Sequence, residues 1–441
     1  MPWSLTSLQR AGAVCVRHGW RRCLLLYSDR SPALELVQRS LQDAGVSTES
    51  HLASPSFAAT PELVDAVAAG AEAELVLGVG NGALLDLAKA VAAMTPLVKE
   101  SRHGSTAPGF SALTARFLLG EEGGHSLLPG ASLPLLLVPS HATVATSSGR
   151  CLLRRNDAVA SLVPMAVAGP GPFGVGVGLQ ATEILADVSV TSQQSVRGRA
   201  AAVAHAMSVF VDAAAAAAGT IKQKQLMDDM MVGVGSSFSA LRHPDASAYD
   251  ALDATLAAGV CASDADANAR GELCAIHALA ATMVGCRDVS FPMACRVLLP
   301  PVLRVWAEEE DSEAQKCIAG LSEAMLGPAK SPHHALLALA DWLDGALSAA
   351  SLPSQLPLAP LECPDSAAAL LALETLTSPV AQQRPQPGWF EPKCLRTIFR
   401  SSLDDGRGKK SDAVHADPRP PCGNIRKELA QQKSGTPVTP S

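Results

Sequence analysis

The chain has 441 residues, of which 48% are hydrophobic and 17% are charged. This composition excludes a wholly disordered protein, and the length predicts a large core divided between two domains. A net charge of −7 and an aromatic content of only 4% argue against a nucleic-acid binder, which needs basic patches and stacking rings. No apolar run reaches the ~18 residues of a membrane span, so we expect neither a nucleic-acid nor a membrane partner.

The eleven cysteines are scattered and contain no CxxC pair. They therefore predict small buried apolar residues in a reducing compartment rather than a disulfide framework. Residues 1–22 are basic and contain no acid, a composition that organellar transit peptides share. Because Arg22 to Asp29 already has the pattern of a first core strand, we favour the cytoplasm.

Strand and helix patterns alternate through the first half of the chain. Short apolar runs predict buried strands, and segments with helical spacing follow them. The predicted strands cover residues 23–28, 74–80 and 133–140, and the predicted helices cover residues 31–45, 61–73 and 83–94. Such alternation predicts an α/β domain with a parallel, doubly wound sheet. Residues 101–132 predict a surface excursion, and the glycine-rich residues 168–178 predict an irregular or edge segment.

Strand patterns stop at about Ser195. Long segments that favour helix by composition and length then cover residues 199–218, 225–241, 272–285, 294–310 and 333–350. The second domain is therefore predicted to be all-α. We place the dinucleotide-binding α/β domain at residues 1–190, the helical domain at 191–403 and a disordered tail, rich in Pro, Lys and Ser, at 404–441.

The segment ELVLGVGNGALLDLAKAVA, residues 74–92, is an apolar run, three glycines and a helical pattern. The start of a helix offers unpaired backbone N–H groups and a positive dipole end, which suit a phosphate. Glycines let the backbone approach it closely. Asp29, after the first strand, is placed to accept bonds from a ribose, and the hydroxyl-rich residues 139–148 suit a second phosphate. Each feature also has an explanation as a turn or a cap without a ligand.

In order and spacing these motifs resemble the iron-containing alcohol dehydrogenase family, with its glycerol-dehydrogenase-like and maleylacetate-reductase-like branches, over residues 10–403. The family's GGGSxxDxAK motif is similar to GNGALLDLAK, residues 80–89, and its PTTAGTGSE motif to PSHATVATS, residues 139–147. The later helical signatures are similar to HAMS, residues 205–208, and to IHALAATMVGCRDVSFPMACRVLLP, residues 276–300. The resemblance implies a dehydroquinate-synthase-like architecture with an active site between the two domains.

The resemblance also implies NAD or NADP as cofactor, and an acid at the position of Asp29 implies NAD. The cofactor-binding residues carried over are Asp29, Gly80, Asn81, Gly82, Asp86, Ser140, His141 and Thr143. Two positions depart from the first motif, since Asn81 replaces a glycine and Ala83 a serine. In the second motif Thr143 and Ala145 replace glycines, which narrows the room for a pyrophosphate.

The family's metal site uses one Asp and three His, which fall on Ala201, His205, His277 and Phe291 of this chain. A family histidine assigned to proton relay falls on Ala281. Only His205 and His277 keep a donor atom, whereas a divalent cation needs three or four donors and charge compensation. We therefore expect weak binding of iron or zinc and favour inherited histidines that are satisfied by neighbours or water. The maleylacetate-reductase-like branch, which is taken to work without metal, also lacks the Asp but keeps histidines at the positions of Ala281 and Phe291, so this chain departs from that branch as well.

Two hypotheses for function remain open. The first is an NAD(P)-dependent oxidoreductase for a small alcohol, aldehyde or ketone, working without metal, with His277 as the acid and His205 binding the substrate oxygen. The alternative is a catalytically inactive pseudoenzyme that keeps the fold for binding or regulation, because the losses fall on the chemical positions. A metal-free lyase or synthase ranks last, since no basic set surrounds the histidines. A homo-oligomer is compatible with either hypothesis.

Overall fold

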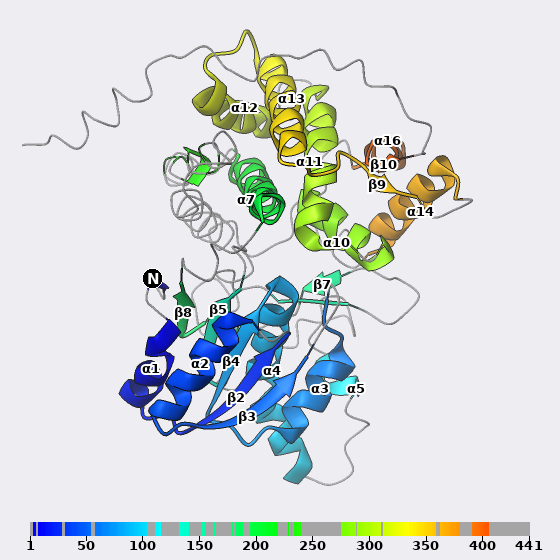
Figure 1. Ribbon diagram of the computed structural model, residues 1–441. Helices are drawn as coiled ribbons and strands as arrows, with labels where there is room; N and C mark the ends of the chain where they lie inside the picture. The colour runs from blue at the N-terminus through cyan, green and yellow to red at the C-terminus, as the bar shows by residue number, and fades with distance from the viewer. Residues whose placement is uncertain are drawn as a thin grey trace, which may run out of the picture.

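The structure of the protein, a computed structural model shown in Figure 1, describes the following parts of the chain. These are residues 3–5, 8–28, 31–53, 58–103, 111–115, 132–140, 151–154, 162–164, 179, 181–187, 195–218, 228, 231, 233–235, 237, 239, 275–287, 289–309, 312–358, 362–378 and 390–404. Predictions on Asp29, His141, Thr143, residues 168–178, most of residues 225–241 and the tail beyond residue 404 lie outside the described residues.

A six-stranded sheet forms the first half of the chain, with the order β1-β8-β5-β4-β2-β3 (Figure 1). The strands are β1 (Trp3–Leu5), β2 (Arg22–Tyr27), β3 (Ser47–Leu52), β4 (Leu75–Gly80), β5 (Leu135–Pro139) and β8 (Glu183–Ala186). All neighbouring strands are parallel, which confirms the predicted fold class. The segment predicted as the first core strand is the second, because β1 precedes it and pairs with β8 at the sheet edge.

Helices cover both faces of this sheet. They are the 3-10 turn η1 (Leu8–Arg10), α1 (Ala11–His18) and α2 (Pro32–Asp43) on one face, and α3 (Pro61–Gly70), α4 (Gly82–His103) and α5 (Ser111–Ala115) on the other. Within β4, Leu75 and Leu77 pack toward α1 and α2, whereas Val76 packs toward α3 and α4. Burial of both faces explains why β2, β4 and β5 are continuous apolar runs rather than alternating ones. The edge strand β3 is polar and mostly exposed.

Part of the predicted surface excursion at residues 101–132 is packed instead. Helix α4 extends to His103, and α5 lies against α3. The buried Thr114 donates its hydroxyl and its backbone N–H to the carboxylate of Asp65. A carboxylate buried at this contact needs these donors, so α5 is held by a polar contact that composition alone did not reveal.

Gly78 in β4 sets how closely α4 approaches the sheet. A Cβ added at Gly78 would lie 2.7 Å from the Cβ of Ala88 on α4. Gly78→Ala is therefore expected to lower the free energy of unfolding by about 1–3 kcal/mol through overpacking. Gly345→Ala is the matched control, because an added Cβ meets nothing within 4 Å there. Gly345 lies inside the helix Pro332–Ala349, where alanine should raise the free energy of unfolding by about 0.5–1 kcal/mol. Denaturant unfolding measures both, and equal effects would contradict the packing argument.

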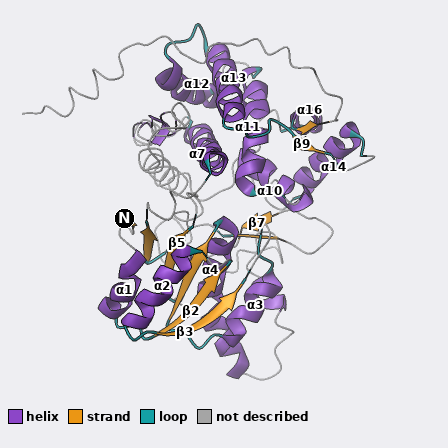
Figure 2. Cartoon of the chain, viewed as in Figure 1, coloured by secondary structure: helices purple, strands orange, loops and turns teal. Residues whose placement is uncertain are grey.

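The second half of the chain is helical, as Figure 2 shows by colour. Its helices are α7 (Val196–Ala217), α10 (Ala275–Arg287), α11 (Phe291–Ala307), α12 (Glu313–Leu326), α13 (Pro332–Ala349), α14 (Pro364–Thr377) and α16 (Pro392–Ser401). Ser195 caps α7 with its side chain, at the position where the strand patterns were seen to stop. A small exception to the all-α prediction is the parallel pair β9 (Leu356–Pro357) and β10 (Leu403–Asp404).

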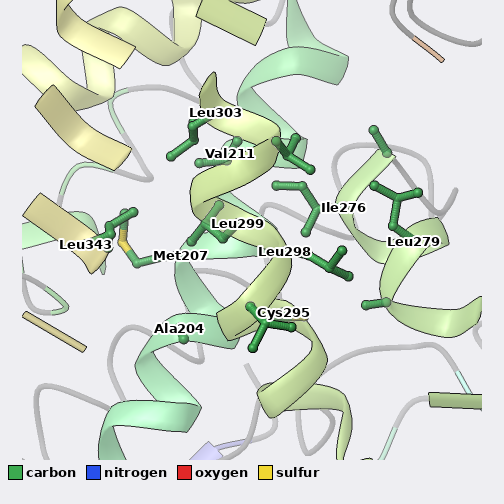
Figure 3. Close-up of a cluster of buried hydrophobic side chains, with 14 of the residues drawn as sticks. Ala204, Met207, Val211, Ile276, Leu279, Cys295, Leu298, Leu299, Leu303 and Leu343 are labelled. Carbon is green, nitrogen blue, oxygen red and sulfur yellow. The ribbon is translucent and has the colours of Figure 1, made fainter. Parts of the chain in front are cut away.

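The core of this half is a single hydrophobic cluster around α11 (Figure 3). Met207 and Val211 on α7, Ile276 on α10 and Leu343 on α13 all point into it. Because α11 contacts α7, α10 and α13, its residues face several helices at once. The position of any side chain on α11 is therefore fixed by packing on several sides.

A short antiparallel hairpin connects the two halves (Figure 1). It consists of β6 (Leu152–Arg154) and β7 (Leu162–Pro164). On one side the Cys151 thiol donates to the Asp86 carbonyl of α4 at 3.1 Å. On the other side Leu152 packs against Ala278 of α10, and Arg154 Nη2 donates to the Gly285 carbonyl at 3.2 Å. The hairpin segment thus contacts both α4 and α10 directly. Among the described helices, none combines the length and the hydropathy of a membrane span.

Candidate functional site

Two predicted cofactor residues, Gly80 and Ser140, lie together at the carboxyl ends of adjacent strands. Gly80 ends β4, Ser140 directly follows β5, and the Ser140 N–H donates to the Gly80 carbonyl at 2.9 Å. A Cβ at Gly80 would lie 2.4 Å from Leu84 Cδ2 and 2.9 Å from Ser28 Oγ. Glycine is therefore required at this turn. Nucleotides bind at this edge of parallel α/β sheets.

Asn81 caps the helix that follows. Its Oδ1 accepts the N–H of Leu84 at 3.2 Å, and its carbonyl accepts the N–H of Leu85 at 3.0 Å. Asn81 thus occupies one donor that a phosphate would otherwise use. The amides of Gly82 and Ala83 belong to the first helical turn and have no intrahelical acceptor. These two amides are the donors that α4 can still offer to an anion.

Asp86 points toward the hairpin rather than along the strand ends. Its carboxylate pairs with the buried Lys89 ammonium at 3.4 Å and accepts the backbone N–H of Leu152. Burial raises the pKa of Asp86 from 3.8 to about 6, against the opposing charge of Lys89. These contacts give Asp86 a part in holding the hairpin against α4.

The raised pKa of Asp86 predicts a pH dependence of stability. The folded state favours the protonated carboxyl, so this contribution is fully present below about pH 4 and is lost as pH rises through 6. Relative to Asp86→Asn, the wild type should lose about 2 kcal/mol of unfolding free energy between roughly pH 4.5 and 7.5. Denaturant unfolding of both proteins at several pH values measures the difference, and parallel curves would refute the assignment.

The two predicted histidines come together with Phe291. His205 on α7 and His277 on α10 are both buried, with ring centroids 5.6 Å apart. The ring of Phe291, at the start of α11, lies 5.1 Å from the first and 5.6 Å from the second. Ala201 lies one helical turn before His205 and presents only a methyl group. Three helices therefore build this cluster: α10 and α11, which are consecutive, and α7, which is distant from them in sequence.

Asp212, which the sequence analysis missed, holds His277 in place. Its carboxylate accepts the backbone N–H groups of Ile276 at 3.1 Å and of His277 at 3.0 Å, at the start of α10. The same carboxylate lies 2.6 Å from Nδ1 of His277. When Nδ1–H donates to the carboxylate, Nε2 of His277 keeps its lone pair. A signal was present, because Asp212 is the only acid among residues 196–217 and the residues around it, 209–217, are otherwise apolar.

Cys295 is the second residue that the sequence analysis missed. It lies one helical turn after Phe291 on α11, close to Ala204 of α7 in Figure 3. The donor atoms of His205, His277 and Cys295 all lie within 4.8 Å of one another. Burial raises the pKa of the Cys295 thiol, a hydrogen bond with Ser208 opposes this, and the charge of Asp212 adds to it. The helical spacing from Phe291 to Cys295 was the available signal.

The donor set of the resembled family does not fit these residues. Ala201 has no donor atom, and the Phe291 ring lies beside both imidazoles where the family has a histidine. A site with one carboxylate and three imidazoles is therefore not available here. The residues present offer two imidazoles and a thiol instead.

The comparisons with known proteins agree with this fold. Residues 5–153 match the family model described as iron-containing alcohol dehydrogenase. An archaeal alcohol dehydrogenase from a Red Sea brine pool is 15% identical, with a TM-score of 0.73, covering 91% of this chain and 96% of that one. The NADH-dependent butanol dehydrogenase A of Thermotoga maritima is also 15% identical, with a TM-score of 0.66 and coverages of 91% and 96%.

A 1,3-propanediol oxidoreductase is 17% identical, with a TM-score of 0.68, covering 91% of this chain and 97% of that one. No curated protein sequence matches this chain significantly. At such identities the structural likeness establishes the fold, whereas the family match covers the first third of the chain. The resemblance is therefore confirmed: residues 5–153 match the iron-containing alcohol dehydrogenase family, and the chain has the two-part fold of the solved alcohol dehydrogenase structures.

Proposed function

We propose that the chain is an NAD(P)-dependent oxidoreductase that interconverts a small alcohol with its aldehyde or ketone. The observation that carries the proposal is the buried Asp212–His277 pair beside His205. A carboxylate that fixes one tautomer of an imidazole is how enzymes orient a proton-transferring histidine. The cap of α10 needs only the two backbone N–H bonds to Asp212, so the further contact with the His277 ring favours the enzyme over the pseudoenzyme.

The nicotinamide cofactor would lie along the strand ends. Gly80 and the amides of Gly82 and Ala83 support a place for its pyrophosphate. The full set proposed for binding remains the one carried over from the family: Asp29, Gly80, Asn81, Gly82, Asp86, Ser140, His141 and Thr143. The inward contacts of Asp86 give it an indirect part, through the position of the hairpin. NAD is favoured over NADP because of the acid at Asp29.

When bound, the nicotinamide accepts or supplies the hydride. In alcohol oxidation the carbinol C–H electron pair leaves as hydride, and the hydroxyl loses its proton. The proposed acceptor of that proton is Nε2 of His277, and the carboxylate of Asp212 stabilises the resulting imidazolium. His205 would bind the substrate oxygen beside it. Reduction of a carbonyl reverses these steps, with His277 as the acid.

The hairpin contacts both the helix that begins at the proposed nucleotide turn and the helix that carries His277. Leu152 packs against Ala278, the neighbour of His277, and Cys151 bonds to Asp86 of α4. Helix α4 begins at the proposed pyrophosphate donors. The nucleotide turn and the histidine pair are thus linked through one short element, as hydride transfer between a cofactor and a substrate would need.

The test is a titration of the purified protein with NADH and NADPH, followed by nucleotide fluorescence. Turnover is then measured on the same sample with a panel of small alcohols, aldehydes and ketones. Binding with turnover supports the proposal, and no binding of either nucleotide overturns it. Binding without turnover on the panel would favour the pseudoenzyme.

The proposal carries further expectations about the protein's surroundings. It implies a small-molecule substrate and a cytoplasmic enzyme, and it is compatible with a homo-oligomer. Light scattering after size-exclusion chromatography measures the oligomeric state. Cell fractionation with an antibody to the chain tests the compartment.

A further inference from the structure

The strongest feature outside the proposed reaction is the thiol that joins the two histidines. The sequence analysis counted two donors, His205 and His277, and expected weak metal binding for that reason. The structure places the Cys295 sulfur within 4.8 Å of a donor nitrogen on each histidine, and all three residues are buried. Three convergent donors in a buried place are the number that a catalytic-type zinc site takes from a protein.

We infer that His205, His277 and Cys295 bind a zinc ion, with the fourth position left for water or a substrate oxygen. Two imidazoles and a thiolate suit zinc, which is a borderline-soft cation. The harder carboxylate-containing set of the resembled family suits iron better. The inferred site therefore differs from the family's site in both donor set and metal.

Asp212 supports this inference independently of the donors themselves. Its carboxylate lies 2.6 Å from Nδ1 of His277, which leaves Nε2 as the ligand atom. Metal-binding histidines usually donate their other nitrogen to a carboxylate or carbonyl in this way. The carboxylate also adds a negative charge near the cation, beside that of the thiolate. Charge compensation, which the loss of the family carboxylate at Ala201 had removed, is thereby restored.

The position of Cys295 explains how the chain replaces the histidine donor that the resembled family has at the position of Phe291. Both residues lie on α11, and a spacing of four residues puts them on one face of the helix. The donor thus moves one helical turn along the same element. The surrounding core fixes α11 on several sides, so Cys295 is presented without rearrangement of the backbone.

The inference goes beyond the proposed function and does not rest on turnover. A bound zinc ion and a transferred proton would use the same lone pair on His277 Nε2. The zinc-loaded protein and the proton-transferring enzyme are therefore two distinct states of one site. Binding measurements report on the first state and turnover reports on the second.

Cobalt spectroscopy on the full chain tests the site directly. The protein is freed of metal by dialysis against a chelator and titrated with Co²⁺, and zinc content is measured in parallel by mass spectrometry. One equivalent should bind, with a thiolate-to-cobalt charge-transfer band in the near ultraviolet. Cys295→Ser should abolish the band and weaken zinc binding at least about 10-fold. Asp212→Asn should keep the band and weaken binding roughly 10- to 100-fold.

Cys317→Ser is the matched control, because Cys317 is also buried in the helical half but lies on α12. It should leave both the band and the affinity unchanged. X-ray absorption at the zinc edge of the wild type needs no variant and should show one sulfur at about 2.3 Å. Failure of the wild type to bind either metal, binding without a sulfur ligand, or a band that survives in Cys295→Ser would overturn the inference.

The same sample separates this inference from the proposed function. A chain that binds zinc through sulfur but neither binds nucleotide nor turns over keeps the inference and removes the oxidoreductase. A chain that turns over after chelation, without zinc binding, does the reverse.

Discussion

Replacing Asp212 by alanine is expected to lower the free energy of unfolding by about 3–5 kcal/mol. The carboxylate is buried and accepts three hydrogen bonds, from two backbone N–H groups at the start of α10 and from the His277 ring. Alanine leaves these donors without the acceptor that the carboxylate provides, so α10 loses this side-chain cap. Urea unfolding followed by circular dichroism measures the loss.

The control for this prediction is Asp341→Ala. Asp341 also pairs with a basic group, Arg304 at 2.9 Å, but its side chain is 72% exposed. An exposed pair contributes at most about 1 kcal/mol, so this variant should unfold close to the wild type. The free energy of unfolding of Asp212→Asn should lie between those of the two alanine variants, because the amide oxygen still accepts one of the N–H groups. Similar unfolding curves for Asp212→Ala and Asp341→Ala would contradict the capping role.

The fold was readable from the sequence because its main elements carry local signals. The apolar runs of β2, β4 and β5 have no alternation, which is what burial on both faces of a parallel sheet imposes. Ser195 and Ser331 mark helix starts by chemistry that needs no tertiary contact. The strands β1, β6, β7 and β8 escaped prediction because they have three or four residues each and carry too little pattern. The six-residue strand β3 escaped for another reason, since it is polar and mostly exposed.

The site was only half readable for a different reason. His205 and His277 were found through a resemblance, which points only to positions that the family uses. The contact between Asp212 and His277 spans 65 residues of sequence, and Cys295 meets both histidines only after three helices pack. Asp212 lies outside the motif matches, whereas Cys295 lies within the matched residues 276–300 at a position to which the resemblance assigned no role. No local pattern encodes such a meeting. A lone acid in an apolar helix is the kind of signal to test first.

The alternative uses of the site can be distinguished because they differ in what each residue contributes. Proton transfer needs His277 and the carboxylate that orients it, whereas zinc binding also needs the sulfur of Cys295. Cys295→Ser therefore removes zinc binding and should leave the turnover of the metal-free enzyme within a few-fold of the wild type. Replacing His277 should impair both proton transfer and zinc binding, because its Nε2 lone pair serves both.

Replacing His277 by alanine is expected to lower kcat of the metal-free enzyme about 10²- to 10⁴-fold, the usual contribution of a positioned acid or base. The nucleotide affinity should not change, because the proposed pyrophosphate donors at the start of α4 lie on the other side of the hairpin from His277. Turnover under saturating substrate and a parallel NADH titration measure the two effects separately.

Alanine also removes a ring that packs against His205 and Phe291, so a loss of activity alone does not prove a chemical role. His277→Gln keeps much of the volume and a polar group but cannot carry the proton, and it should lose as much kcat as alanine. His333→Ala is the control. His333 lies at the start of α13, where its ring is hydrogen-bonded to the carbonyl of Ala307 and takes no part in the proposed site. The kcat of this variant should match that of the wild type. If His277→Gln turns over as fast as the wild type, His277 is not the proton carrier, because glutamine cannot accept and release the proton.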